Sequence, residues 1–419
     1  MQSIADRDRT FFTALGSFLE KNHRLTILMG NHDIELALPS VRRKLKEVIG
    51  VKPYHDYEFI CNGEAYEVGE ALIEHGNRYD QWNVVNYDNL RHISSRQSRR
   101  QEITEKYKFD PPAGSKMVSW VINEIKEEYK FIDLLKPETE VAFPLLMALE
   151  PGYWQLLATV AKLGLQSHAH RLEGPLDPLV EGDIHAEGNS TSDEFLSDMS
   201  TYQGEDSKTL SPTDDNEAAL EVVLQKGLGK DCRTFLNELS PKGTKSDAES
   251  GGDISTKDVK DRTYGLFQLL LAHNDQDIGS RMPALLKALQ ALQPDRNFDQ
   301  NFEAAAVYTD AATELFKAGY QYVIFGHTDL AKKIELQPDR WYLNSGTWSD
   351  LIRLPDNIID ATPADARKVL DPFVQDLGGG YLDRWIVFHP TYIQLDLDAN
   401  NHIAHAELLS YQGTTAFRG

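Results

Sequence analysis

The stretch RLTILMGNHDIELALP, residues 24–39, decides how the rest of the chain is interpreted. In it, an apolar run ends on the tetrapeptide GNHD, residues 30–33. This pattern predicts a buried strand that delivers polar side chains to the edge of a sheet. There Asn31 can offer an amide oxygen to a cation, His32 can ligate or transfer a proton, and Asp33 can orient an imidazole. A simple turn favoured by Gly and Asn is the alternative that this stretch alone leaves open.

Two further segments end in the same way. The strand predicted before residue 74 ends on His75, and the apolar run 320–325 leads into GHTD, which supplies His327 and Asp329. One such ending is common, because turns are rich in polar residues. Three such endings are less easily explained by turns, because the last lies about 250 residues beyond the other two. They favour side chains that converge on one metal site.

The motifs GNHD, EHGN and FGHTD, in this order, resemble those of the calcineurin-like metallophosphoesterases. The resemblance covers roughly residues 1–85 and 300–419. It implies an α/β fold, a two-sheet αββα sandwich, with a large and mostly helical insertion. It also implies a dinuclear metal centre at the strand ends, and hence hydrolysis of a phosphate ester or anhydride by a phosphatase or phosphodiesterase.

The same resemblance implies a role for each site residue. Asn31, His75 and His327 would ligate one metal ion. His32 would face the substrate, and Asp33 would hold its ring. Two divalent ions about 3.5–4 Å apart can activate a hydroxide and clamp an in-line displacement at phosphorus. Mixed nitrogen and oxygen ligands suit Mn, Fe, Zn or Co.

The chain departs from the family pattern in two places. The opening Asp-x-His and Gly-Asp motifs, which supply the other metal's ligands, do not precede GNHD. This predicts either a chain truncated at its N-terminus or a site with one half lost, and truncation is the favoured interpretation. Asp329 stands where the family places a second His, so it is expected either to ligate a metal or to cap the turn.

The organisation along the chain predicts a core in two parts, residues 1–85 and 301–419, with an insertion at 86–300 that acts as a lid. Within the insertion, residues 171–262 hold about 21 acidic and 10 basic side chains, so this segment is expected to be largely disordered. Hydrophobic periodicity and breakers predict the elements: helices over 6–22, 39–49, 118–132, 151–165 and 301–319, a hairpin turning at Asn62–Gly63, and a C-terminal strand pair over 384–398 and 402–411.

Composition narrows the classes of function. The chain has 419 residues, a formal net charge of -22 and two cysteines, Cys61 and Cys232. The acidity excludes a generic nucleic-acid binder, and two distant cysteines cannot form a disulfide framework. With no apolar run of membrane length and no signal-like N-terminus, a cytoplasmic protein is expected. Its oligomeric state is left open.

Two functions are weighed. The first is a metallophosphoesterase that acts on a phosphorylated small molecule or a lipid-linked phosphate, impaired where metal ligands are missing. The second is a non-catalytic scaffold of the same fold that binds a protein through the insertion.

Overall fold

The computed structural model describes residues 2–80, 83–104, 107–112 and 295–412, and the single positions 115, 134, 282, 283, 285, 286, 289 and 290. The chain forms two compact units. The larger comprises residues 1–142, 292–360 and 371–419, and the smaller comprises 143–291 and 361–370. Helices mix with several small sheets, which confirms the α/β class. The helices predicted over 118–132 and 151–165 and the acidic segment 171–262 lie outside the described residues.

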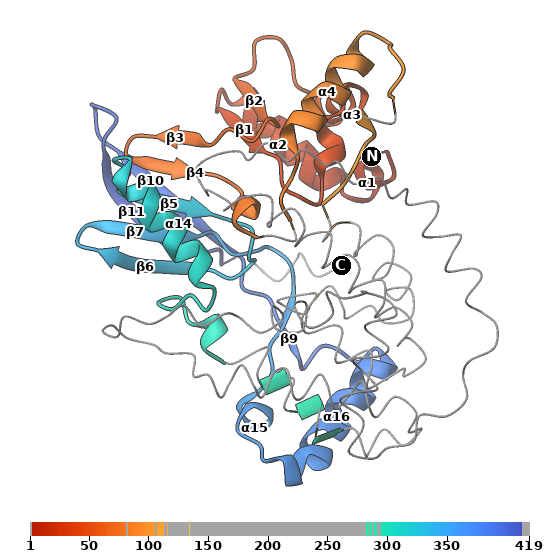
Figure 1. Ribbon diagram of the computed structural model, residues 1–419, viewed down its shortest axis with the longest axis vertical. Coiled ribbons are helices and arrows are strands. Elements are labelled where there is room, and N and C mark those ends of the chain that lie inside the picture. Colours follow the sequence, from red (N-terminus) through yellow and green to blue (C-terminus); the bar gives the residue numbers. More distant parts are fainter. Residues whose placement is uncertain are drawn as a thin grey trace, which may run out of the picture. The chain divides into compact units, whose positions relative to one another are not determined.

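The largest sheet in the described part of the larger unit has five strands (Figure 1). Its strand order is β3-β4-β5-β7-β6. Strands β4, β5 and β7 run parallel, while β3 and β6 are antiparallel to their neighbours at the two edges. The strands span Tyr66–Val68 (β3), Ala71–Ile73 (β4), Tyr322–Phe325 (β5), Lys332–Gln337 (β6) and Arg340–Asn344 (β7).

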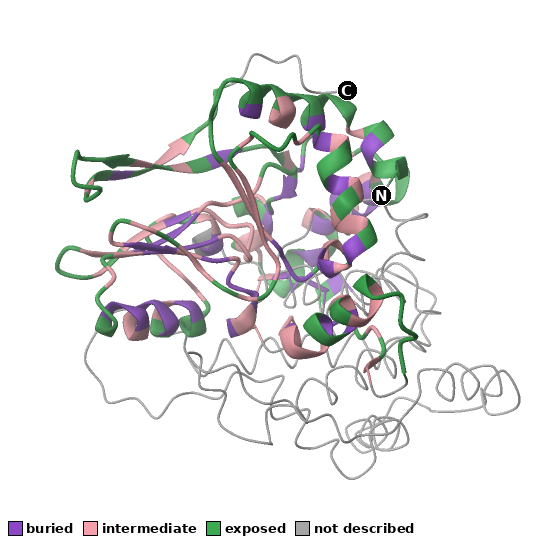
Figure 2. Ribbon diagram, turned by 90° about the horizontal axis from the view of Figure 1, so that it is seen from above, coloured by how far each residue is buried: buried purple, intermediate pink, exposed green. Residues whose placement is uncertain are grey.

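Each face of this sheet is covered by a different element. Helix α14 (Ala306–Lys317) packs on one face, where Phe316 joins Val323 and Tyr342 in a buried cluster. The antiparallel hairpin β10 (Thr391–Leu397) and β11 (Ile403–Ser410) lies on the other face, where its apolar residues contact the buried ones of β4, β5 and β7. Figure 2 shows this hairpin exposed toward its tip. The stacking therefore gives one helix layer and two strand layers.

The N-terminal part of this unit carries its own small sheet. Strand β1 (Leu25–Leu28) pairs in parallel with β2 (Tyr57–Ile60), and helices α2 (Arg9–Glu20) and α3 (Pro39–Ile49) pack against this pair. Helix α4 (Tyr87–Ser98) joins a separate apolar cluster beside the end of β1.

Nine further elements complete the described part of the chain. They are α1 (Gln2–Arg7), η1 (Ile34–Ala37), η2 (Asn77–Tyr79), η9 (Asp295–Phe298), β8 (Leu351–Ile352), α15 (Asp356–Ile359), η10 (Pro363–Asp365), α16 (Ala366–Gly379) and β9 (Ile386–Val387). None of the helices in the described residues is long and apolar enough to cross a membrane.

Several predicted boundaries agree with the structure. Helix α3 begins at Pro39 and ends before Gly50, whose φ of 80° gives the left-handed cap that glycine adopts without a steric cost. The C-terminal strand pair is also confirmed. The helix predicted over 6–22 is divided at Asp8 into α1 and α2, and the one over 301–319 begins only at Ala306.

The predicted hairpin at Asn62–Gly63 is wrong. Strand β2 pairs with β1, whereas β3 pairs with β4, so this segment links two different sheets. An Asn-Gly pair specifies a turn, but the partner of each strand depends on where its apolar side chains are buried. Tyr57 of β2 packs with helices α2 and α3, and that packing directs β2 away from β3.

Lys332 is a charged residue inside this fold, only 1% exposed. Its Nζ donates hydrogen bonds to the carbonyl oxygens of Asn297 at 2.6 Å and Asp299 at 2.9 Å. Burial lowers the pKa of this ammonium, and the carboxylate of Glu303 opposes that effect. Lys332 thereby fastens the segment before α14 to the edge strand β6.

Replacing Lys332 by Met is expected to destabilise the protein by roughly 2–4 kcal/mol, because the buried carbonyl group of Asn297 and the partly buried one of Asp299 lose their donor. The neighbouring Lys333 provides a matched control, since it lies partly exposed and donates to a single carbonyl, that of Ala406. The Lys333→Met variant should lose less than about 1 kcal/mol. Urea unfolding of both variants measures the difference, and equal losses would contradict the assigned role of Lys332.

Candidate functional site

Parallel pairing of β4 and β5 places two histidines side by side. Ile73 is paired with Ile324, and the pairing continues past both strands. The carbonyl oxygen of His75 accepts hydrogen bonds from the backbone N–H groups of Gly326 and His327, at 3.1 and 2.9 Å. Because carboxyl ends of parallel strands meet at one edge of a sheet, residues about 250 positions apart become neighbours.

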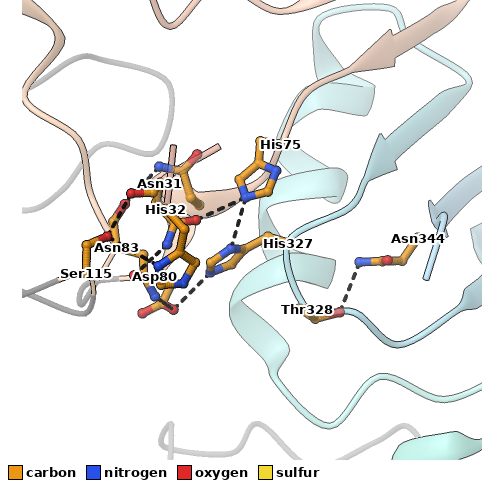
Figure 3. A network of polar contacts seen from close by, with 10 residues as sticks. Asn31, His32, His75, Asp80, Asn83, Ser115, His327, Thr328 and Asn344 are labelled. Carbon is orange, nitrogen blue, oxygen red and sulfur yellow. Dashed lines mark hydrogen bonds and ion pairs between the residues drawn. The ribbon is translucent and has the colours of Figure 1, made fainter. Parts of the chain in front are cut away.

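Asn31, at the end of β1, completes a group of three side chains (Figure 3). Its Oδ1 lies 3.0 Å from Nε2 of His75, and that Nε2 lies 3.4 Å from Nδ1 of His327. The two imidazole rings meet at 66° with their centroids 5.2 Å apart. The three predicted ligands of one metal ion are thus brought together.

Gly30 makes this approach sterically possible. A Cβ at this position would lie 3.0 Å from the ring of His75 and 3.2 Å from Oδ1 of Asp33. The ring and the carboxylate therefore flank a backbone position that has room only for hydrogen. The glycine of GNHD is explained by close packing, since its backbone does not lie in the left-handed region.

The carboxylate of Asp80 connects the polar groups around these three residues. Its Oδ2 accepts a hydrogen bond from Nδ2 of Asn83 at 2.7 Å and lies 3.0 Å from Nε2 of His327. The Oδ1 of Asn83 in turn accepts from Nδ2 of Asn31 at 2.7 Å. This Asp80 network fixes how both outer members of the trio are turned.

The direction of each hydrogen bond follows from the carboxylate, which can only accept. Asn83 must donate to Asp80, so its own oxygen faces Asn31 and receives the NH₂ group there. The oxygen of Asn31 then points at His75. A neutral His327 ring likewise donates through Nε2, and the lone pair of its Nδ1 is then directed at His75. Two acceptor atoms therefore converge on Nε2 of His75.

Burial keeps the central imidazole neutral. Desolvation lowers the pKa of His75 to about 4, the neighbouring His327 adds to the effect, and the charge of Asp329 opposes it. Asn31 is completely buried, and the side chain of His327 is 9% exposed. A neutral imidazole is the form that binds metal ions.

Two of the separations within the trio are compatible with the ligand shell of a divalent cation. Ligand atoms that lie about 2.0–2.2 Å from one tetrahedral metal stand roughly 3.3–3.5 Å from each other, and somewhat closer in octahedral sites. The observed separations of 3.0 and 3.4 Å agree with such a shell. Among the described residues, no group of three or more His, Cys, Asp or Glu side chains is arranged to hold a metal. The trio consists of two histidines and one asparagine.

The two predicted catalytic residues lie beside this trio. His32 is exposed, and its Nδ1 lies 3.4 Å from Oγ of Ser115. Asp33 accepts hydrogen bonds from the backbone N–H of Gly30 and from its own, while burial raises its pKa to about 6. The role of Asp33 in holding the ring of His32 stays a prediction.

Asp329 occupies the turn that follows β5. Its backbone has a φ of 61°, and its N–H points at the carbonyl oxygen of Gly326 over 3.4 Å. Its charge acts on His75, as noted above, so the carboxylate belongs to the electrostatic surroundings of the trio. Asp329 therefore forms part of the turn and also lies near the trio.

The residues that follow His75 serve mainly as internal supports. Asn77 donates to the carbonyl oxygen of Asn83 at 2.8 Å, and Tyr79 donates to the buried carboxylate of Glu74 at 2.5 Å. Arg78 pairs with the same carboxylate at 2.9 Å. Together these contacts hold the segment that ends at Asp80.

The segment NSGTW, residues 344–348, begins at the last residue of β7, where the Asn344 side chain supports the chain that follows. The side chain of Asn344 donates to Oγ1 of Thr328 at 3.0 Å and accepts from the N–H of Gly346 at 3.0 Å. Figure 3 shows this pair set apart from the two histidines.

Sequence patterns did not identify Asp80, Asn83 or Ser115 as site residues. Asp80 and Asn83 follow His75 in a polar loop, where composition alone marks no single position. Ser115 lies far along the chain, yet its hydroxyl donates to the carbonyl oxygen of Asn31 at 2.7 Å. Only the fold brings these three side chains to the site.

Comparison of the chain with protein-family models, with curated proteins and with solved structures gave no match.

The pKa shifts of His75 and Asp33 have opposite effects on how the stability of the metal-free protein depends on pH. Between pH 6.5 and 4 the unfolded state binds more protons at His75, so its contribution to stability falls as pH falls, by roughly 3 kcal/mol in all. Between pH 6 and 3.8 the folded state binds more protons at Asp33, which has the opposite effect. The two contributions largely cancel from pH 6 to 4.

The Asp33→Asn variant should therefore lose stability more steeply than the wild type as pH falls from 6.5 to 4. Urea unfolding in the presence of EDTA at several pH values measures this slope. Asp383→Asn removes an exposed carboxylate and serves as the control. Parallel curves for the wild type and Asp33→Asn would show that the shift assigned to Asp33 is wrong.

Proposed function

We propose that the chain carries the site of a metal-dependent phosphoesterase, which hydrolyses a phosphate ester or anhydride. The observation that carries this proposal is the convergence of Asn31, His75 and His327. They come from the ends of three strands in two sheets, and their ligand-type atoms lie 3.0 and 3.4 Å apart. These atoms lie close enough to share a proton, and a bound divalent cation would take its place.

The layers of the larger unit are compatible with the αββα sandwich of the calcineurin-like family. Helix α14, the five-stranded sheet and the β10–β11 hairpin supply an α, a β and a further β layer. Membership of this family is proposed on the motifs GNHD, EHGN and FGHTD and on the meeting of their side chains at strand ends.

Asn31 would hold the metal through Oδ1, His75 through Nε2 and His327 through Nδ1. Asp80 would act as the outer carboxylate that orients the ring of His327, a common arrangement for histidine ligands. Bound there, a divalent ion supplies Lewis-acid stabilisation of charge on a phosphoryl oxygen. In the proposed dinuclear centre of Mn, Fe, Zn or Co, Asp329 is the candidate ligand for the other ion.

His32 would act on the substrate itself. It is exposed beside the trio, and its Nδ1 lies near the hydroxyl of Ser115. Its Nε2 would donate a proton to the leaving oxygen. Proton transfer of this kind contributes about 10²–10⁴-fold to a rate. The proposed substrates are a phosphorylated small molecule or a lipid-linked phosphate.

A non-catalytic scaffold is the second candidate. The Asp-x-His and Gly-Asp motifs do not precede GNHD in this sequence, so the ligands that they would give to the other metal are missing from the chain as given. In a scaffold, the trio would bind a single metal ion that stabilises the fold, and no hydrolysis would take place. Metal binding and catalysis must therefore be measured separately.

Metal binding is tested by calorimetric titration with Mn²⁺ and by the accompanying rise in melting temperature. Asn31→Ala, His75→Ala and His327→Ala should each abolish the effect, and Asp80→Asn should weaken binding about 10–100-fold. His405→Gln, on exposed strand β11, is the control and should bind as the wild type does. Circular dichroism confirms that each variant is folded.

Hydrolysis is tested with a generic aryl phosphodiester in the presence of Mn²⁺. The His32→Ala variant should bind Mn²⁺ normally but turn over at least about 100-fold more slowly. Activity that is equal in wild type, His32→Ala and Asn31→Ala would eliminate the enzyme. Metal binding that depends on the trio, with no turnover in any variant, would favour the scaffold.

A further inference from the structure

A second candidate binding site lies in a cleft between helix α3 and strand β2. It has a volume of about 340 Å³, which falls in the range of small-molecule sites. Its lining shares no residue with the trio or the Asp80 network. The residues that line it are Pro39, Arg42, Arg43, Lys46, Tyr57 and Phe59.

The charged residues of the lining are all basic, in a protein whose formal net charge is -22. The lining contains three cations and no carboxylate. Nearby cations elsewhere have acidic partners: Arg24 lies 2.7 Å from Glu58, and Lys44 of the same helix lies 2.8 Å from Glu47. Within the part of the chain that the structure describes, no ion pair involves the cations of the cleft. Their charge therefore faces the cleft without compensation.

The helix itself makes this arrangement unfavourable while the cleft is empty. Arg42 and Arg43 lie near the N-terminal end of α3, where the helix dipole disfavours positive charge, and the first turn has no acidic residue. Lys46 is spaced three and four positions from the two arginines, so like charges share one helix face. A bound anion would relieve both effects.

Arg42 is held in place for such contacts. Its guanidinium donates to Sγ of Cys61 at 3.3 Å, and the side chain is only partly exposed. Lys46 lies over the ring of Tyr57, 5.3 Å from its centroid. Arginine forks bind phosphate oxygens in pairs, and lysine adds a point charge.

We propose that this cleft binds a small organic diphosphate. The three cations Arg42, Arg43 and Lys46 would hold the phosphates, and the aromatic rings of Tyr57 and Phe59 would contact the organic part. The site is independent of the proposed hydrolytic site and requires no metal ion.

The test uses the full chain in EDTA, with inorganic pyrophosphate and ADP as probes in calorimetric titrations. The expected result is one binding site per chain and a rise in melting temperature on addition of the probe. The double variant Arg43→Gln/Lys46→Gln changes two side chains that make no ion pair in the described structure, so it should fold normally. It should lower affinity at least about tenfold, because charged hydrogen bonds are lost.

Two control variants distinguish binding in this cleft from a general effect of net charge and from binding at the metal site. Lys21→Gln/Lys368→Gln removes the same charge from two exposed side chains outside the cleft and should bind as the wild type does. His75→Ala should also bind normally, so a failed metal site does not affect the outcome. Three results would overturn the proposal: no probe binding by the wild type, equal loss in both double variants, or loss in His75→Ala. Binding to phosphatidic acid vesicles without binding of pyrophosphate would also reject a small soluble ligand.

Discussion

The carboxylate of Asp80 is the constraint on which the candidate site depends. It can only accept hydrogen bonds, so it fixes the orientation of Asn83 and His327 at once. Through Asn83 it also fixes Asn31. Acceptor atoms consequently face inward around a neutral His75, an arrangement that would be unfavourable in a dry interior without a proton or a cation between them.

The backbone supplies the other half of this geometry. Hydrogen bonds from Gly326 and His327 to His75 extend the parallel pairing of β4 and β5 beyond the strands. The backbone between each strand end and its histidine is therefore short, and these hydrogen bonds hold it in place. At the end of β1, Gly30 lets the ring of His75 approach closely. Strand pairing places the residues, and the polar network then turns their side chains.

Charge is distributed unevenly over this acidic chain. The proposed phosphoester site would receive positive charge from metal ions, as an acidic protein requires for an anionic substrate. The cleft on α3 instead presents Arg42, Arg43 and Lys46 directly. Two different solutions to anion binding are thus proposed, one where β1, β4 and β5 end and one between α3 and β2.

The sequence by itself determined the α/β class, the helix from Pro39 to the cap at Gly50, and the candidate ligands Asn31, His75 and His327. These follow from local periodicity, capping and motif order, which neighbouring residues encode. Only the tertiary structure decided the partners of β2 and β3, and the recruitment of Asp80, Asn83 and Ser115. Strand partners and hydrogen-bond networks depend on where distant apolar faces are buried, and no local pattern carries that information.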